Sequence, residues 1–205
     1  MKPETKRALK QLREIKKLGG DMRLAAEGWS AEWKILISTI MSAQTRDETT
    51  IPVAENLFKK YPSVKKLSQT TPENIAKIIK RVNFHKTKSK NIVACCKKLM
   101  KEHKGKIPHD INKLIELPGV GRKTANVFLA EVGKDAIGVD THLSYTSRKL
   151  EWTKNKDPTK IEKDLEKLFP TKYWKDLNWI TVRFGKSHLS RRKKDTLLEE
   201  IRSIR

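Results

Sequence analysis

Two residues of this chain have side-chain types and positions that could carry covalent chemistry. Lys123 lies within a glycine-rich segment, residues 117–125 (LPGVGRKTA), and Asp140 lies in the segment GVDTH at residues 138–142. A lysine amine attacks carbon only in its neutral form, and a lysine in water is protonated at neutral pH. A fixed carboxylate facing that amine suits a reaction whose transition state carries positive charge on a sugar ring. The pair therefore suits nucleophilic attack on a sugar carbon.

The glycine-rich segment predicts two helices joined by a tight turn, a helix-hairpin-helix. We expect an apolar helix over residues 110–117 to be stopped by Pro118, and a second helix to begin at about Gly121. Gly119 and Gly121 permit positive φ and close backbone approach. The amides of the Gly119-Val120-Gly121 turn, with the N–H groups of the next helix, can then point together at a DNA phosphate.

Lys123 is expected in the first turn of that second helix. The positive end of the helix dipole disfavours a further cation there, and we expect the dipole, Arg122 and partial burial to favour the neutral amine. A lysine in this place can instead be a plain phosphate contact. Asp140 is expected to cap a helix over residues 141–150, where a carboxylate keeps its negative charge. Its alternative role is that of a cap without chemistry.

These segments, together with residues 41–47 (MSAQTRD) upstream, resemble the endonuclease III group of DNA glycosylases in the helix-hairpin-helix, Gly/Pro/Asp-loop superfamily. The resemblance runs from about residue 29 to residue 150 and continues more weakly to about residue 194. It implies that Lys123 attacks C1′ of a damaged nucleoside while Asp140 assists, which makes such an enzyme both a glycosylase and an abasic-site lyase. It further implies a double-stranded DNA substrate with a damaged base or an abasic site, oxidised pyrimidines being the expected bases.

The resemblance also implies side chains that open the duplex. It places Gln44 in the space left by an extruded base, whereas a polar helix end is the alternative. Relatives usually show Leu-Tyr-Asn where this chain has Phe84, His85 and Lys86, and Phe84 fits their second wedge by shape because an apolar side chain can lever open a base step. A core phenylalanine is the alternative there, and His85 is expected to make a polar contact. The remaining expected DNA contacts are Gly119, Val120, Gly121, Arg122, His142, Lys186 and Arg191.

Cysteine content separates this chain from many relatives, which commonly carry a four-cysteine loop for a [4Fe-4S] cluster from about residue 185 onward. Here the only cysteines are Cys95 and Cys96. A cluster needs four thiolate ligands, so we expect no cluster, no metal and no other cofactor. A final helix over about residues 195–202 is expected in place of the loop. Its apolar residues would replace the structural role of the metal, and Lys186 with residues 191–194 would keep the phosphate contacts.

Composition favours a nucleic-acid partner. The 205 residues include 46 Lys plus Arg against 24 Asp plus Glu, a net charge of +22, and the basic groups are spread along the chain without a low-complexity tail. We find no Trp/Leu-rich amphipathic anchor, no apolar run long enough to span a bilayer and no signal peptide. We therefore expect a monomer without membrane association, located with the DNA in the cytoplasm or nucleoid of a prokaryote or in the nucleus of a eukaryote.

The residue patterns predict an all-α fold, since helical spacing and capping signals recur and no strand pattern does. An N-terminal helix is expected to end at Gly19-Gly20. A helix over residues 31–42, after a Ser30 cap, is apolar almost all round and is expected to be the central helix of the core. Thr71 is expected to cap a helix over residues 72–80, and Asp157 one over residues 158–169. The other expected helices, besides those given above, span residues 45–60, 87–102, 122–132 and 172–184. The resemblance implies two helical domains flanking a DNA-binding cleft. Residues 28–135 would form a barrel-like domain with the hairpin. Residues 1–27 and 136–205 would form a second domain without an iron-sulfur loop.

Two other functions stay open at this point. A non-catalytic helix-hairpin-helix protein would use the same turn to bind DNA and would have no reaction to lose. A monofunctional glycosylase would remove a mismatched base without cutting the strand, but relatives of that kind generally have Tyr or Ser where Lys123 stands.

Overall fold

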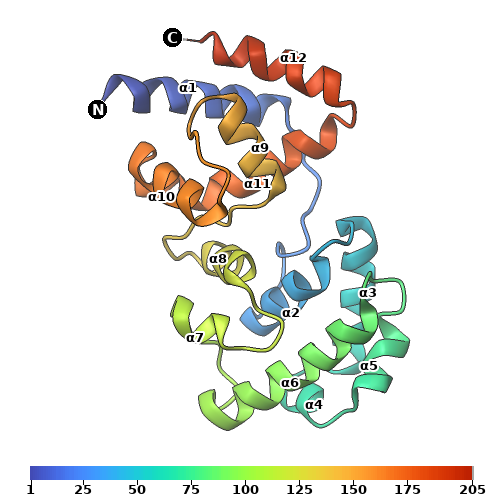
Figure 1. Ribbon diagram of the computed structural model, residues 1–205. Helices are drawn as coiled ribbons and strands as arrows, with labels where there is room; N and C mark the ends of the chain where they lie inside the picture. The colour runs from blue at the N-terminus through green and yellow to red at the C-terminus, as the bar shows by residue number, and fades with distance from the viewer. Residues whose placement is uncertain (205) are drawn as a thin grey trace. The chain divides into compact units, whose positions relative to one another are not determined.

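The computed structural model describes residues 1–204, which form helices joined by turns and contain no strand (Figure 1). The chain divides into two compact units, one built from Met1–Met22 with residues 133–204 and the other from Arg23–Val132. The all-helical fold predicted from the sequence is confirmed. Among residues 1–204, no helix is both long and apolar enough to pass through a bilayer.

The Arg23–Val132 unit is built around one helix that is buried nearly all round. Its helices are α2 (Glu32–Ser42), α3 (Asp47–Lys60), α4 (Val64–Ser68), α5 (Pro72–Ile78), α6 (His85–His103), α7 (Ile111–Ile115) and α8 (Arg122–Glu131). Seven consecutive residues of α2, Ile35 to Met41, are buried, and α2 packs against α3, α6 and α8. This confirms α2 as the central helix, as expected from apolar residues placed almost all round it.

The other unit joins the N-terminal helix to the C-terminal part of the chain. It contains α1 (Pro3–Leu18), α9 (Thr141–Lys149), α10 (Pro158–Leu168), the 3-10 turn η1 (Thr171–Tyr173), α11 (Trp174–Ser187) and α12 (Arg191–Arg202). Figure 1 shows α1 beside α12, and α1 also packs on α11. Gln11 of α1 fixes this arrangement, because its side chain accepts a bond from Trp152 Nε1 (2.7 Å) and donates to the carbonyl of Ile201 (3.4 Å).

Helix ends with a local capping signal were predicted well, and those without one were not. Thr71 caps α5 and Asp157 caps α10, each accepting a backbone N–H, as expected. The predicted Ser30 cap is wrong, because α2 begins after Ala31 with no side-chain cap. Helix α4 was not predicted, since five residues are too few to show a period.

The last helix begins earlier than predicted. Helix α12 starts at Arg191 rather than at about residue 195, because the Ser190 side chain accepts the Lys193 N–H and caps it. Leu198 and Ile201 are buried in the unit's core. Asp195 attaches the same helix to α9, since it accepts a bond from the Tyr145 hydroxyl and pairs with Lys149 Nζ at 2.7 Å.

Candidate nucleic-acid interface

The hairpin between α7 and α8 forms as the sequence predicts, and Gly119 is the residue that makes its turn possible. Its φ is +82°, in the left-handed region that side chains rarely adopt. A Cβ at this position would also lie 2.8 Å from the Cβ of Asn91 on α6. Gly119 is therefore required both by the turn and by the close packing of the turn against α6.

Gly121 and Val120 differ from what we expected. The φ of Gly121 is −90°, so this glycine does not use the positive φ that its type permits, and a Cβ added at this position would meet nothing within 4 Å. The Val120 amide, predicted to face a phosphate, instead donates to the carbonyl of Leu117 at 3.0 Å and closes the turn. No atom of residues 1–204 requires glycine at 121, so its lack of a side chain leaves room for the close approach of an outside backbone.

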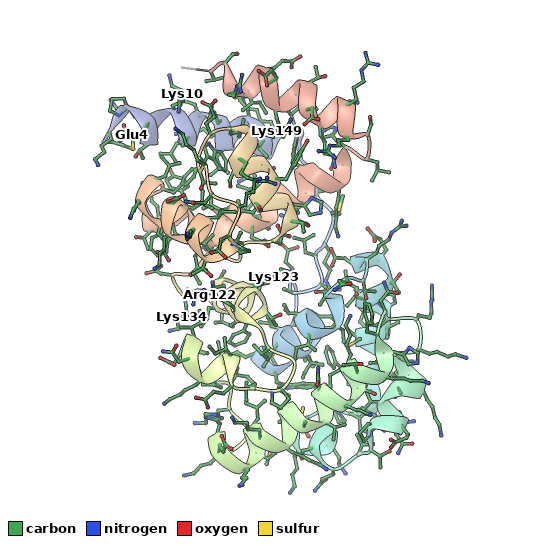
Figure 2. All side chains as sticks on the ribbon, in the orientation of Figure 1. Glu4, Lys10, Arg122, Lys123, Lys134 and Lys149 are labelled. Carbon is green, nitrogen blue, oxygen red and sulfur yellow. The ribbon has the colours of Figure 1, made fainter. Side chains whose placement is uncertain are left out.

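Lys123 lies in the first turn of α8, next to Arg122 (Figure 2). The first bond of this helix runs from the Ala125 N–H to the Gly121 carbonyl, so the N–H groups of Lys123 and Thr124 lie at the positive end of the helix dipole. The first turn of α8 contains no acidic residue. Lys123 is exposed, so the partial burial that we expected for it is wrong.

Asp140 belongs to the other unit and caps α9, as predicted. Its Oδ1 accepts the Leu143 N–H at 2.8 Å, and the residue is half-buried. One carboxylate oxygen is thereby fixed at the start of a helix, where the dipole stabilises negative charge. The geometry is that of a carboxylate whose orientation is fixed by its own helix.

The two candidate wedge residues lie at the ends of α2 and α6 within one unit. Gln44 follows the last turn of α2, is exposed and has φ +55°. Phe84 directly precedes α6, has φ +57° and is 63% exposed. This exposure rules out the alternative of a core phenylalanine. A large apolar side chain held in solvent is instead typical of a contact surface.

The remaining predicted contacts lie in several settings. Arg191 is exposed at the first position of α12, and Lys186 is half-buried near the end of α11. The ring of His142 lies so close to α11 that a Cβ added to Gly185 would come within 2.1 Å of its Nδ1. His142 therefore packs inside its own unit, which favours a structural role over the DNA contact that we expected. His85 is half-buried at the start of α6 and lines a basic pocket.

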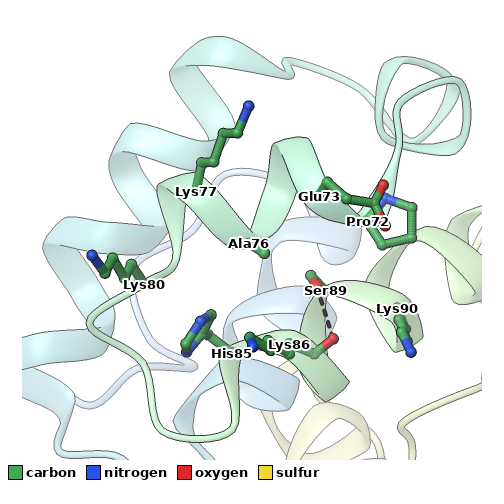
Figure 3. Close-up of a pocket in the computed structure, with 9 residues that line it drawn as sticks. All are labelled: Pro72, Glu73, Ala76, Lys77, Lys80, His85, Lys86, Ser89 and Lys90. Carbon is green, nitrogen blue, oxygen red and sulfur yellow. Dashed lines mark hydrogen bonds between the residues drawn. The ribbon is translucent and has the colours of Figure 1, made fainter.

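That pocket was not predicted from the sequence. It lies between α5 and α6 and has a volume of about 360 Å³ (Figure 3). Its lining consists of Pro72, Glu73, Ala76, Lys77, Lys80, His85, Lys86, Ser89 and Lys90. Four lysines and one histidine against one glutamate make it attractive to a phosphate group. Lys77 is on α5, Lys80 lies in the turn that follows it, and Lys86 and Lys90 are on α6, so the packing of α5 on α6 brings them together.

A second missed residue is Lys88. Its position within the basic stretch of residues 86–90 suggested one more solvated charge, but the side chain is buried, with 7% exposed. Its ammonium group contacts the loop that carries Gln44.

A cysteine-ligated cluster does not fit this chain. The sequence has two cysteines, and both are buried in α6, where burial raises the pKa of Cys95 to about 12 and that of Cys96 further. Such thiols stay protonated and are poor metal ligands. Residues 191–202 form α12, which is held by apolar packing and by Asp195. Among residues 1–204, no group of three or more His, Cys, Asp or Glu side chains is placed to hold a metal ion.

Comparison with known proteins gives consistent matches. A family model described as "HhH-GPD superfamily base excision DNA repair protein" matches residues 37–171. Endonuclease III of Thermotoga maritima is 37% identical over 155 residues, which cover 75% of this chain and 73% of that protein. Endonuclease III of a Synechocystis species is 38% identical over 162 residues, covering 78% of this chain and 74% of that protein.

Solved structures agree with the sequence matches. The structure of a trapped endonuclease III–DNA covalent intermediate has a TM-score of 0.83 and 29% identity, covering 91% of this chain and 88% of that one. A thermostable thymine-DNA glycosylase, at 19% identity and a TM-score of 0.77, shares the fold over 91% of this chain and 90% of its own. The family match includes the hairpin, Asp140 and both wedge candidates.

Proposed function

The chain belongs to the HhH-GPD superfamily of base excision DNA repair proteins, and from this premise we propose that it is a DNA N-glycosylase with abasic-site lyase activity, in which Lys123 is the nucleophile and Asp140 its partner carboxylate. The observation that carries the assignment of Lys123 is its position. It is an exposed lysine in the first turn of a helix, where the dipole disfavours a cation, and it lies two residues after Gly121, a glycine that no atom of residues 1–204 requires.

DNA is the proposed substrate in double-stranded form, with a damaged base or an abasic site. The open face at Gly121 and the N–H groups at the start of α8 would receive a backbone phosphate, as helix starts do for anions. Gln44 and Phe84 would enter the duplex where the damaged nucleotide leaves it. The net charge of +22 supports binding to such a polyanion. We further propose oxidised pyrimidines as substrates and a monomer that acts where the cell keeps its DNA.

The first chemical step replaces the base by the enzyme. The neutral Lys123 amine attacks C1′, a C1′–N bond to lysine forms, and the bond between C1′ and the base breaks, with the base leaving with the electron pair and taking up a proton. The ionised Asp140 stabilises the positive charge that develops on the sugar, and it can accept the proton that the attacking nitrogen loses.

The second step cuts the strand. Opening of the sugar ring gives a protonated Schiff base between C1′ and Lys123, which makes the C2′ proton acidic. Loss of that proton forms a C2′–C3′ double bond and expels the 3′ phosphate, and water then hydrolyses the Schiff base and restores the lysine. These steps use the side chains and water alone.

The test is a panel of duplexes, each with one lesion, incubated with and without borohydride, with the released bases and the cleaved ends identified. The proposal predicts base release, strand cleavage on the 3′ side and a covalent adduct that needs borohydride. Lys123→Gln should abolish the adduct and leave DNA binding. Base release without an adduct would instead identify a monofunctional glycosylase. Binding without either product would identify a non-catalytic DNA-binding protein.

A further inference from the structure

Lys88 is a buried cation that the proposed chemistry does not use. It lies in the first turns of α6, four residues after Phe84, and its side chain is directed at the end of α2. Its Nζ donates to the carbonyls of Met41 (2.7 Å) and Ala43 (2.5 Å) and to Thr45 Oγ1 (3.2 Å). These three acceptors match the three N–H donors of an ammonium group.

The acceptors explain why a cation is stable at this place. The last carbonyls of a helix carry partial negative charge and lack partners within the helix. Burial lowers the pKa of Lys88 to about 8, so at neutral pH the ammonium form, with all three donors, predominates. Lys88 therefore closes the end of α2 and holds the turn that follows.

Asn83 makes a second connection between the same two loops. Its side-chain Nδ2 donates to the Gln44 carbonyl at 2.5 Å, and its backbone N–H donates to Thr45 Oγ1 at 3.1 Å. Thr45 Oγ1 thus accepts from both Asn83 and Lys88. The bonds join two segments that are 39 residues apart in the sequence.

The residue at the tip of each connected loop, Gln44 or Phe84, has an unfavourable backbone conformation. Gln44 and Phe84 have φ values of +55° and +57°, and neither is a glycine. Such conformations persist only where the surrounding structure holds them. The contacts of Lys88 and Asn83 adjoin both tips, and these tips carry the two exposed side chains.

We propose that Lys88 and Asn83 are positioning residues that join the Gln44 and Phe84 loops into one strand-opening element, so that both side chains are already aligned before DNA binds. This inference rests on the proposed function, since it assigns the way in which that site opens the duplex. The two residues do not touch the reacting atoms. They act through Gln44 and Phe84.

The test separates strand opening from chemistry. Lys88→Met removes all three bonds and keeps the length of the side chain, and Lys97→Met, an exposed lysine of the same helix, is the matched control. One substrate is a duplex with an abasic site and 2-aminopurine as its neighbour, whose fluorescence reports unstacking. The other is a single-stranded abasic oligonucleotide, which needs no opening.

We expect Lys88→Met to lower the unstacking signal and to slow single-turnover cleavage of the duplex about tenfold. Trapping on the single strand should stay within about twofold of wild type. Lys88→Arg, which keeps the charge and the donors, should recover part of the duplex rate. Equal losses on both substrates, or a normal unstacking signal, would overturn the inference.

Asn83→Ala covers the case in which Lys88→Met does not fold. Asn83 is exposed, so truncating its side chain leaves no cavity in the core. It should show the same pattern to a smaller degree, and its effect should not add fully to that of Lys88→Met, because both variants weaken the same connection. If the wild-type protein gives no trapped adduct, the proposed function alone is contradicted, because the unstacking signal still measures whether the two loops open the duplex. Wild-type trapping together with unchanged unstacking in both variants would contradict only the inference.

Discussion

Asp140 has one role that the structure shows, as the cap of α9, and one that we propose, in the chemistry, and a single substitution can separate them. Its Oδ1 caps α9 by accepting the Leu143 N–H, which an asparagine oxygen can also do, whereas only the aspartate carries a charge. We expect Asp140→Asn to keep the free energy of unfolding within about 1 kcal/mol of wild type. Its single-turnover rate should fall by about 10²-fold, because the charge that stabilises the transition state is lost.

The control for this variant is Asp157→Asn. Asp157 caps α10 in the same way, with its Oδ1 accepting the Lys160 N–H at 2.9 Å. Asp157→Asn should show the same small change in the free energy of unfolding as Asp140→Asn, and its single-turnover rate should equal that of wild type. Equal rates for Asp140→Asn and Asp157→Asn would remove Asp140 from the chemistry.

The two hairpin glycines should respond differently to alanine. Gly119→Ala forces a side chain into a positive-φ position 2.8 Å from Asn91, which should cost about 1–3 kcal/mol of unfolding free energy. At Gly121 the loss of a favourable cap and the lower entropy of the unfolded chain roughly cancel, so stability should stay within about 1 kcal/mol.

The same Gly121→Ala variant should bind DNA about tenfold more weakly, because the added methyl group keeps a phosphate away from the helix start. Denaturant unfolding and a binding titration at fixed salt measure the two effects. Wild-type affinity in Gly121→Ala would mean that no phosphate approaches this face.

At the scale of the elements, α12 depends on Asp195. Hydrogen bonds from Lys149 and from Tyr145 hold the pKa of Asp195 below its usual value of 3.8. A lowered pKa means that the charged form is stabilised by folding. The contribution is therefore present above pH 3.8 and is lost as the pH falls through the lower, folded-state value.

Asp195→Asn should accordingly lower Tm at pH 7. The difference in Tm from wild type should shrink as the pH falls below 3.8 and through the folded-state pKa of Asp195. Thermal unfolding of both proteins across pH measures this. Glu200→Gln, an exposed residue of the same helix, should leave Tm nearly unchanged at every pH. A difference for Asp195→Asn that persists unchanged in strong acid would show that the charge of Asp195 does not hold α12.

The elements also show how far the sequence alone can predict this structure. Capped helices such as α5 and α10 were predicted because a cap is a local signal, and the hairpin because proline and glycine mark its turn. The start of α12 was missed because four basic residues in a row resemble a loop. Lys88 was missed for a different reason. Its role depends on the packing of α6 against the end of α2, which no spacing along α6 encodes.

At the scale of the whole molecule, the positive charge should govern how DNA affinity depends on salt. The logarithm of affinity falls with the logarithm of salt concentration by about 0.9 for each phosphate neutralised. We expect Lys77→Gln and Lys90→Gln, in the basic pocket, each to reduce that slope by about 1 and to weaken binding equally on intact and damaged duplexes.

Lys163→Gln on α10 removes the same charge from an exposed helix position outside the pocket and serves as the reference. Binding titrations at several salt concentrations give all the slopes. Identical slopes for the pocket variants, Lys163→Gln and wild type would show that the pocket does not meet DNA.

The most direct measurement of the central claim locates the covalent bond. The protein is incubated with an abasic-site duplex, trapped with borohydride and digested, and the modified peptide is identified by mass spectrometry. The account predicts one modified residue, Lys123, and no adduct with Lys123→Gln. A sugar attached to another lysine or to the N-terminal amine, or the same yield of adduct from Lys123→Gln, would contradict it.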